Sequence, residues 1–144
     1  MSPLHLFPYL QQNVRLNGLS NVRLRQCAAS NRSVPTIPFW EAPSEHFSMG
    51  ALAAQFHADP IAVPAQTLDD ILDDESIGRV GLLKMDVEGF AAAVLHGARQ
   101  LLTGHDAPLI LFEFCDWAEA RVPGGAVGDT QRLLLEWGYR LWWL

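Results

Sequence analysis

The sequence of 144 residues has few cysteines, few basic residues and no long hydrophobic run. Cys27 and Cys115 are too far apart in sequence for a metal-ligand or redox pair, which favours two separate thiols in the reducing cytoplasm. Ten Lys and Arg against sixteen Asp and Glu give a net charge of -6, which argues against binding of nucleic acid or anionic lipid. No apolar run approaches the roughly 18 residues of a membrane span, and residues 1–10 do not resemble a signal peptide. We therefore expect small-molecule or protein partners.

Apolar material, in contrast, is plentiful, and one stretch of it organises the chain. Residues 80–85 are apolar except for Lys84, and the run ends abruptly on Asp86 and Glu88. Gly89 then turns the chain into a segment whose apolar residues recur at helical spacing: Ala91, Val94, Leu95 and Ala98. The pattern predicts a parallel strand, an acidic turn and a helix that continues to Gly104. Because open α/β sheets bind ligands at the carboxyl ends of their strands, the acidic turn is the first candidate site.

The N-terminal half predicts a helix, a strand and an excursion before that stretch. The helix ends near Asn17, with Pro8 in its first turn and Gly18 as its stop, and alternation predicts a strand over residues 22–27. Prolines divide residues 34–66 into short pieces, which we interpret as a hairpin or excursion over a pocket. Thr67 is then expected to cap a helix that has two aspartates in its first turn.

The C-terminal third repeats the pattern of an apolar strand followed by a helix. Residues 108–114 predict a second buried strand interrupted only by Glu113, near its carboxyl end. Asp129 is expected to cap a helix that Gly138 ends, and residues 139–144 predict a hydrophobic strand. An exposed strand of this kind invites pairing, so we expect either that something covers it or that the natural chain is longer.

Several blocks occur in the order and spacing of one family: residues 13–18, Asn21 with Val22, and residues 67–72, 83–89, 94–98 and 108–113. With Lys-Met-Asp-Val-Glu-Gly as the most specific block, the chain resembles the FkbM family of S-adenosylmethionine-dependent methyltransferases. The resemblance implies an α/β, Rossmann-like class I methyltransferase fold with a mostly parallel sheet in the order 3-2-1-4-5-7-6. Residues 22–27, 80–86, 108–113 and 139–143 then correspond to strands three, four, five and six.

On this alignment the first two strands are absent, together with the glycine-rich turn and the acidic residue that hold the cofactor. Residues 1–144 are therefore expected to be a single, N-terminally truncated methyltransferase domain that lacks half of the cofactor site. Unpaired strand edges predict a chain that is poorly folded, rearranged or self-associated through those edges.

The resemblance also assigns roles to five residues. Asp86 is expected beside the donor methyl group, where it holds the cofactor or orients an acceptor hydroxyl, and Glu88 shares that catalytic work. Ala28 and Ala29 correspond to the adenine side of the cofactor site, and Glu113 is expected to line the substrate pocket. The alternatives are that Asp86 and Glu88 cap the turn and the following helix, and that Glu113 is an ordinary strand-end carboxylate. The family often has a second Glu three residues after the first, but Ala91 stands there in this chain.

The expected reaction is O-methylation of a hydroxyl on a small-molecule or glycan acceptor, such as a sugar, a glycolipid or a secondary metabolite. One alternative is a non-catalytic remnant or interaction module that has lost the cofactor site. A weaker one treats Asp86, Glu88 and Glu113 as oxygen ligands of a divalent metal in a hydrolase. We expect no metal site, because the sequence shows no convergent fourth ligand.

Overall fold

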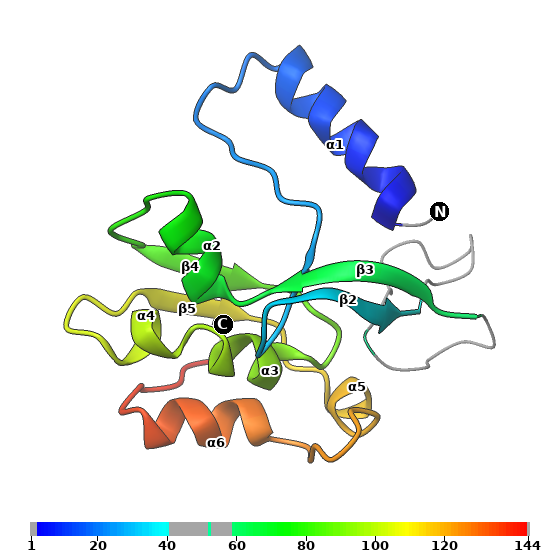
Figure 1. Ribbon diagram of the computed structural model, residues 1–144. Helices are drawn as coiled ribbons and strands as arrows, with labels where there is room; N and C mark the ends of the chain where they lie inside the picture. The colour runs from blue at the N-terminus through cyan, green and yellow to red at the C-terminus, as the bar shows by residue number, and fades with distance from the viewer. Residues whose placement is uncertain (1–2, 41–51, 53–58, 144) are drawn as a thin grey trace.

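The computed structural model describes residues 3–40, 52 and 59–143, and these form a mixed α/β fold with two small sheets (Figure 1). The first sheet has the strand order β1-β3-β2, and the second contains β4 and β5. In chain order the elements are α1 (Pro3–Leu16), β1 (Ala28–Ala29), β2 (Val34–Phe39), β3 (Ile61–Gln66), α2 (Leu68–Asp74), β4 (Leu82–Met85), α3 (Ala91–His96), α4 (Arg99–Thr103), β5 (Leu109–Phe112), α5 (Asp116–Glu119) and α6 (Asp129–Glu136).

The expected hairpin is confirmed by β2 and β3. The two strands are antiparallel, with Ile37 opposite Val63, and the register shifts between Val34 and Ile37. Ile37, Val63 and Ala65 are buried and form the core of this sheet. The middle of the excursion, residues 41–51 and 53–58, lies outside the described residues.

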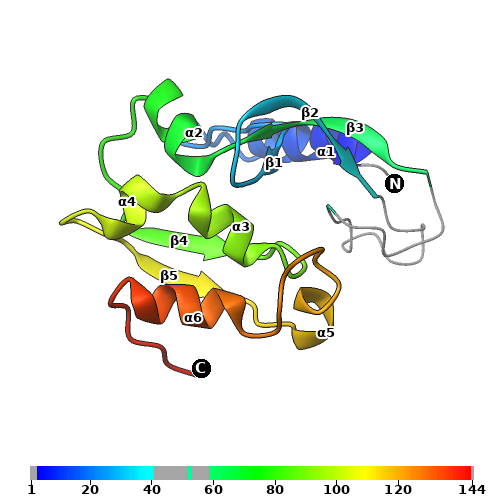
Figure 2. The same cartoon turned by 60° about the horizontal axis from the view of Figure 1, so that its bottom comes forward.

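The two apolar strands that end on acidic residues are also confirmed, and they pair in parallel. Their expected burial is wrong on one face, where Leu82 and Leu109 are 59% and 76% exposed. The register runs from Leu82 opposite Leu109 to Met85 opposite Phe112. One face of the pair packs on the main core, in which Leu95, Leu102 and Leu134 are fully buried. Figure 2 shows α3, α4 and α6 gathered around β4 and β5. The acidic turn therefore begins at the end of a strand that is packed against the core on one face.

The single, mostly parallel sheet is not observed, because β1 to β3 and β4 with β5 form separate sheets. The strand expected over residues 22–27 is wrong: only Ala28 and Ala29 pair, in parallel with Ala65 and Gln66. A strand needs a ladder partner, and β3 provides one only from Ala28 onward. The preceding segment is held instead by side chains, since Arg23 and Arg25 form ion pairs with Glu75 at 3.1 and 2.6 Å.

The strand expected over residues 139–144 is wrong as well. Residues 139–143 form no ladder, and residue 144 lies outside the described part. Trp142 and Trp143 are 81% and 87% exposed, although Trp143 makes an edge contact with Phe114. Apolar composition alone did not create a strand here, because no strand among the described residues pairs with this segment.

The predicted ends of α1 and α6 are confirmed, whereas the predicted first turn of α1 and the predicted N-cap of α6 are wrong. Gly18 follows α1 with a φ of +62°, as expected for a helix stop, but Pro8 is the sixth residue of the helix and not in its first turn. Gly138 ends α6 in the same left-handed conformation. The N-cap of α6 is Gly128 and not Asp129, whose carboxylate accepts a hydrogen bond from the Ala126 amide at 2.6 Å.

Thr67 caps α2 as predicted, because its hydroxyl accepts a hydrogen bond from the Asp70 amide at 3.0 Å. Asp69, in the same first turn, does more than complement the dipole of its own helix. Its carboxylate accepts hydrogen bonds from the amides of Gln100 at 2.9 Å and Leu101 at 3.1 Å. Because no side chain of its own segment caps α4, Asp69 supplies that cap from a distant part of the chain.

The helix expected from Gly89 to Gly104 is divided into α3 and α4. The four residues predicted to face the core are buried, at 0–5% exposure: Ala91, Val94, Leu95 and Ala98. Gly97 lies at the break, where a Cβ atom would approach the Ser30 carbonyl oxygen to 2.0 Å. The break therefore lets the main chain pass directly against the segment that follows β1.

Candidate functional site

The predicted meeting of acidic groups at the carboxyl ends of β4 and β5 is present. Asp86 and Glu113 each follow the last paired residues of their strands, Met85 and Phe112. The Glu113 amide donates a hydrogen bond to the Met85 carbonyl oxygen at 3.3 Å, which extends the ladder by one residue. Two carboxylates from distant parts of the sequence are thereby held at one edge of one sheet.

Asp86 is the anionic member of this group. The Lys84 ammonium donates a hydrogen bond to Asp86 Oδ2 at 2.8 Å, and both side chains are about half exposed. This hydrogen bond is the main reason why the pKa of Asp86 is lowered, and a hydrogen bond with the Glu113 carboxyl lowers it further. Asp86 is therefore ionised at neutral pH, and Lys84 has a structural partner rather than a free ammonium.

Glu88 occupies a different environment in the same turn. Its φ is +47°, a left-handed conformation that is unusual for a residue other than glycine, and Gly89 follows at +87°. Partial burial is the main cause of its raised pKa, and the negative charges of Glu113 and Asp86 raise it further. The turn thus holds a carboxyl that retains its proton more readily than its neighbour does.

The turn is locked against α5. A Cβ atom on Gly89 would lie 2.5 Å from the Ala118 carbonyl carbon, so the backbones of the turn and the helix are in direct contact. Phe90 is buried beside Leu52, Val87 and Val122. This contact leaves no room for a side chain at position 89.

We predict that Glu88→Gln makes the protein slightly more stable at pH 7. A raised pKa in the folded state means that this group stabilises the fold at low pH. That contribution is lost as the pH rises from the ordinary glutamate range through the folded-state pKa. A neutral amide avoids the loss, and the gain should stay below about 1 kcal/mol because the site is partly solvated. Urea unfolding at pH 4 and pH 7 measures it.

Glu136→Gln, on the exposed side of α6, is the matched control and should change stability little at either pH. The expected signature is a difference between Glu88→Gln and the wild type that is larger at pH 7 than at pH 4. A variant that is destabilised more at pH 7 than at pH 4 would show that the Glu88 carboxylate supports the turn in its charged form.

The sequence also allowed Asp86 and Glu88 to cap the helix that follows the turn, and the hydrogen bonds around α3 bear on that alternative. The N-cap of α3 is Phe90, and no side chain makes a cap hydrogen bond there. Asp86 bonds to Lys84 instead. The structure therefore leaves Asp86 and Glu88 without the helix-capping role that the sequence also allowed.

The two alanines assigned to the cofactor lie on the other sheet. Ala28 and Ala29 are half-buried in β1, and Ala29 packs against the core that contains Met85. Because alanine side chains are small, another group can come close to the backbone of β1. The structure thus gathers Asp86, Glu88 and Glu113 into one cluster, with the alanines on a neighbouring element.

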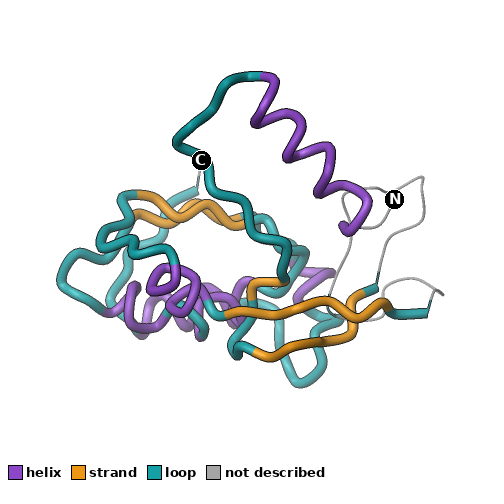
Figure 3. Tube along the Cα trace, turned by 45° about the horizontal axis from the view of Figure 1, so that its top comes forward, coloured by secondary structure: helices purple, strands orange, loops and turns teal. Residues whose placement is uncertain are grey.

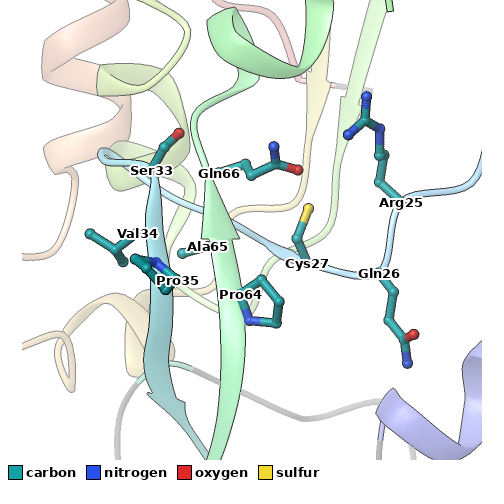
Figure 4. Close-up of a pocket in the computed structure, with 9 residues that line it drawn as sticks. All are labelled: Arg25, Gln26, Cys27, Ser33, Val34, Pro35, Pro64, Ala65 and Gln66. Carbon is teal, nitrogen blue, oxygen red and sulfur yellow. The ribbon is translucent and has the colours of Figure 1, made fainter. Parts of the chain in front are cut away.

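A hollow of about 540 Å³ lies beside the hairpin (Figure 4). Three of the polar residues that line it already have partners: Arg25 binds Glu75, Gln66 donates to Asp74 at 3.3 Å, and Ser33 donates to Asp70. A smaller hollow of about 130 Å³ lies between Phe7 and Ala28. Neither hollow includes the three carboxylates, so the expected pocket beside the hairpin and the acidic cluster are separate features.

Sequence reasoning missed one buried acid. Glu119 is only 5% exposed, and its two oxygens accept hydrogen bonds from the Gly128 amide and the Thr130 hydroxyl, both at 2.6 Å. It ties α5 to the start of α6. The local sequence gives no sign of this role, since the partners are the last residue of a glycine-rich loop and the second residue of α6, nine and eleven residues further on.

Within the described ranges, no three His, Cys, Asp or Glu residues are placed to hold a metal ion. The divalent-metal alternative thus has no ligand set in that part of the chain. No described helix is both long and apolar enough to cross a membrane.

Comparison with known proteins gives one match. The family model described as the methyltransferase FkbM domain matches residues 9–141. No curated protein matches the chain, and no solved structure does.

Proposed function

Since the chain belongs to the FkbM methyltransferase family, whose members depend on S-adenosylmethionine, we propose that it transfers a methyl group at the carboxyl ends of β4 and β5. The observation that carries this proposal is the convergence of Asp86, Glu88 and Glu113 at that edge. In open α/β sheets this is where ligands bind.

We further propose that residues 1–144 belong to one Rossmann-like class I methyltransferase domain. Two observations support this: β4 pairs with β5 in parallel, and β1 pairs with β3 in parallel. Helices follow β3, β4 and β5, as expected for parallel strands joined by crossovers. In a Rossmann-like topology, the acidic turn at the carboxyl end of β4 would lie where ligands bind.

The cofactor is a sulfonium that also carries an ammonium group, so an anionic cluster matches it in charge. When bound, it supplies a methyl group activated for in-line displacement. Asp86, kept ionised by Lys84, is suited to hold a positive group, and Ala28 and Ala29 leave room for a flat ring. These residues therefore suit the cofactor in charge, through one carboxylate, and in size, through two small side chains.

Glu88 and Glu113 are assigned to the acceptor. The raised pKa of Glu88 makes it a better proton acceptor than an ordinary carboxylate, as needed when a hydroxyl loses its proton during methylation. Glu113, exposed at the end of β5, can accept a hydrogen bond from an acceptor hydroxyl. We therefore propose O-methylation of a sugar, glycolipid or secondary metabolite, in the cytoplasm, where unbridged Cys27 and Cys115 remain reduced.

Titration calorimetry with S-adenosylmethionine tests the cofactor assignment directly. Asp86→Asn is expected to weaken binding by about tenfold, because it removes one charged contact of about 1.4 kcal/mol. Asp106→Asn, an exposed aspartate paired with His105, is the control and should bind like the wild type. Transfer of labelled methyl to a panel of hydroxylated acceptors should fall for Glu88→Gln.

Absence of binding by the wild-type chain would overturn the catalytic assignment and favour the second candidate, a non-catalytic interaction module. One observation supports that candidate independently. Several large apolar side chains are strongly exposed, among them Leu82 at 59%, Leu109 at 76% and Trp143 at 87%. Within the described residues β4 pairs only with β5, so its other edge offers a further route to self-association.

A further inference from the structure

The acidic turn has a backbone conformation that its own sequence disfavours. The Phe90 amide donates a hydrogen bond to the Val87 carbonyl oxygen at 3.0 Å, and φ is positive at both residues between them, Glu88 and Gly89. Positive φ at both positions is typical of a type I′ turn, which favours asparagine, aspartate or glycine at the first of them. A left-handed glutamate persists only where the surrounding structure holds it. The conformation of Glu88 therefore depends on contacts outside the turn.

Such contacts come from α5 and from the residues just after it. A Cβ atom on Gly89 would lie 2.5 Å from the Ala118 carbonyl carbon and 2.8 Å from the Glu119 nitrogen, so Gly89 rests on the peptide group that joins these two residues. Phe90, which ends the turn, is 9% exposed and packs against Val122. Helix α1 takes no part in this support, because it is set apart from β4 and β5 (Figure 3).

The Glu119 side chain anchors the helix on which the turn rests. With four residues, α5 is too short to be stable alone. In the described structure, the side-chain hydrogen bonds that join it to the start of α6 both end on Glu119, from the Gly128 amide and the Thr130 hydroxyl. Leu134 of α6 lies in the main core with Val94 of α3, and α3 directly follows the turn. These contacts form a closed ring of turn, α3, α6 and α5, in which Glu119 joins the last two.

We propose that Glu119 is a positioning residue for Glu88: by fixing the peptide group beneath Gly89, it holds the Glu88 carboxyl within the acidic cluster. The inference rests on the role proposed above for Glu88 as the proton acceptor. Loss of the Glu119 hydrogen bonds should let the turn relax toward the right-handed or extended conformations that glutamate prefers, which exposes the Glu88 carboxyl to water. Because partial burial is the main cause of its raised pKa, that pKa should then fall.

NMR titration of the labelled Glu88 carboxyl carbon measures this effect, and Glu88→Gln identifies the signal. Glu119→Ala is expected to lower the pKa of Glu88 toward the ordinary glutamate value. Glu119→Gln should leave it unchanged: its oxygen still accepts from the Gly128 amide, and its nitrogen donates to the Thr130 hydroxyl, which can also accept. Thr130→Val breaks one of the two bonds and keeps the Glu119 charge, so it should give a smaller fall than Glu119→Ala.

The glutamine variant separates position from charge. The charges that raise the pKa of Glu88 are those of Glu113 and Asp86, so neutralising Glu119 without breaking its bonds should not affect Glu88. Leu102→Ala is the matched control for a general loss of stability. Leu102 is fully buried in α4, and α4 and α5 lie at opposite ends of the β4–β5 pair (Figure 2). This variant should leave the pKa of Glu88 unchanged.

Three results would overturn the proposal: no change in the pKa of Glu88 in Glu119→Ala, an equal fall in Glu119→Gln, or an equal fall in Leu102→Ala. If Glu119→Ala does not fold, Thr130→Val decides, and an unchanged pKa there has the same meaning. The titration needs neither cofactor nor acceptor. Its failure is therefore distinct from a failure of the methyl-transfer assignment, which the binding of S-adenosylmethionine tests.

Discussion

Replacement of Gly97 by alanine is expected to lower the free energy of unfolding by at least about 3 kcal/mol. A Cβ atom there would lie 2.0 Å from the Ser30 carbonyl oxygen and 3.3 Å from Thr67 Cα. Both neighbours are main-chain atoms, so no side chain can rotate away to relieve the overlap. Gly97 has a φ of -78°, which any residue adopts, and the cost therefore arises from contact and not from backbone strain.

Urea unfolding followed by circular dichroism measures this effect. Gly78→Ala is the matched control, because a Cβ atom at that position meets nothing within 4 Å. It should stay within about 0.5 kcal/mol of the wild type. A Gly97→Ala protein as stable as the control would mean that the segment after β1 is not held against the break between α3 and α4.

Glu119→Ala is expected to cost about 2–4 kcal/mol. The substitution removes the acceptor for both the Gly128 amide and the Thr130 hydroxyl, and Thr130 is fully buried. Unsatisfied buried donors carry most of that cost, because water cannot reach them easily. Thermal unfolding of the variant should show a clear fall in midpoint.

Two further variants separate the hydrogen bonds from the packing. Glu119→Gln keeps one acceptor oxygen and should lose less than the alanine variant. Thr130→Val removes a donor, so its cost should be smaller in the Glu119→Ala background than in the wild type. Additive losses in that double-mutant cycle would show that the bond between Glu119 and Thr130 carries little of the energy.

The features that the sequence predicted correctly depend on local patterns. The two apolar strands that end on acidic residues can be predicted from five or six consecutive residues. The same holds for the buried face of α3 and for the Thr67 cap. Each of these patterns depends on residues one helical turn or two strand positions apart. Contacts with distant parts of the chain did not change the local structure there. The position of Asp86 and Glu113 at one edge follows from the parallel pairing of β4 with β5, which the sequence analysis expected only from the strand order that the resemblance implies.

The errors share a different cause, which is dependence on distant partners. Residues 22–27 and 139–143 have the composition of strands, but no neighbouring ladder is available to either in the described structure. The contact that divides α3 from α4 joins Gly97 to Ser30, 67 residues earlier. Glu119 similarly depends on a loop whose path the sequence does not reveal. Contacts of this kind cannot be predicted from local sequence, because they depend on how distant segments are placed in the fold.

The bridge from Asp69 to α4 has a consequence for cooperativity. A helix of only five residues is too short to persist alone, because nucleation costs more than so few hydrogen bonds return. Two of its first amides are satisfied only when α2 is already docked, with a chain separation of 31 and 32 residues. We infer that α2 and α4 form and melt as one unit. A substitution that removes the Asp69 carboxylate should therefore loosen α4, although α4 lies about 30 residues further along the chain.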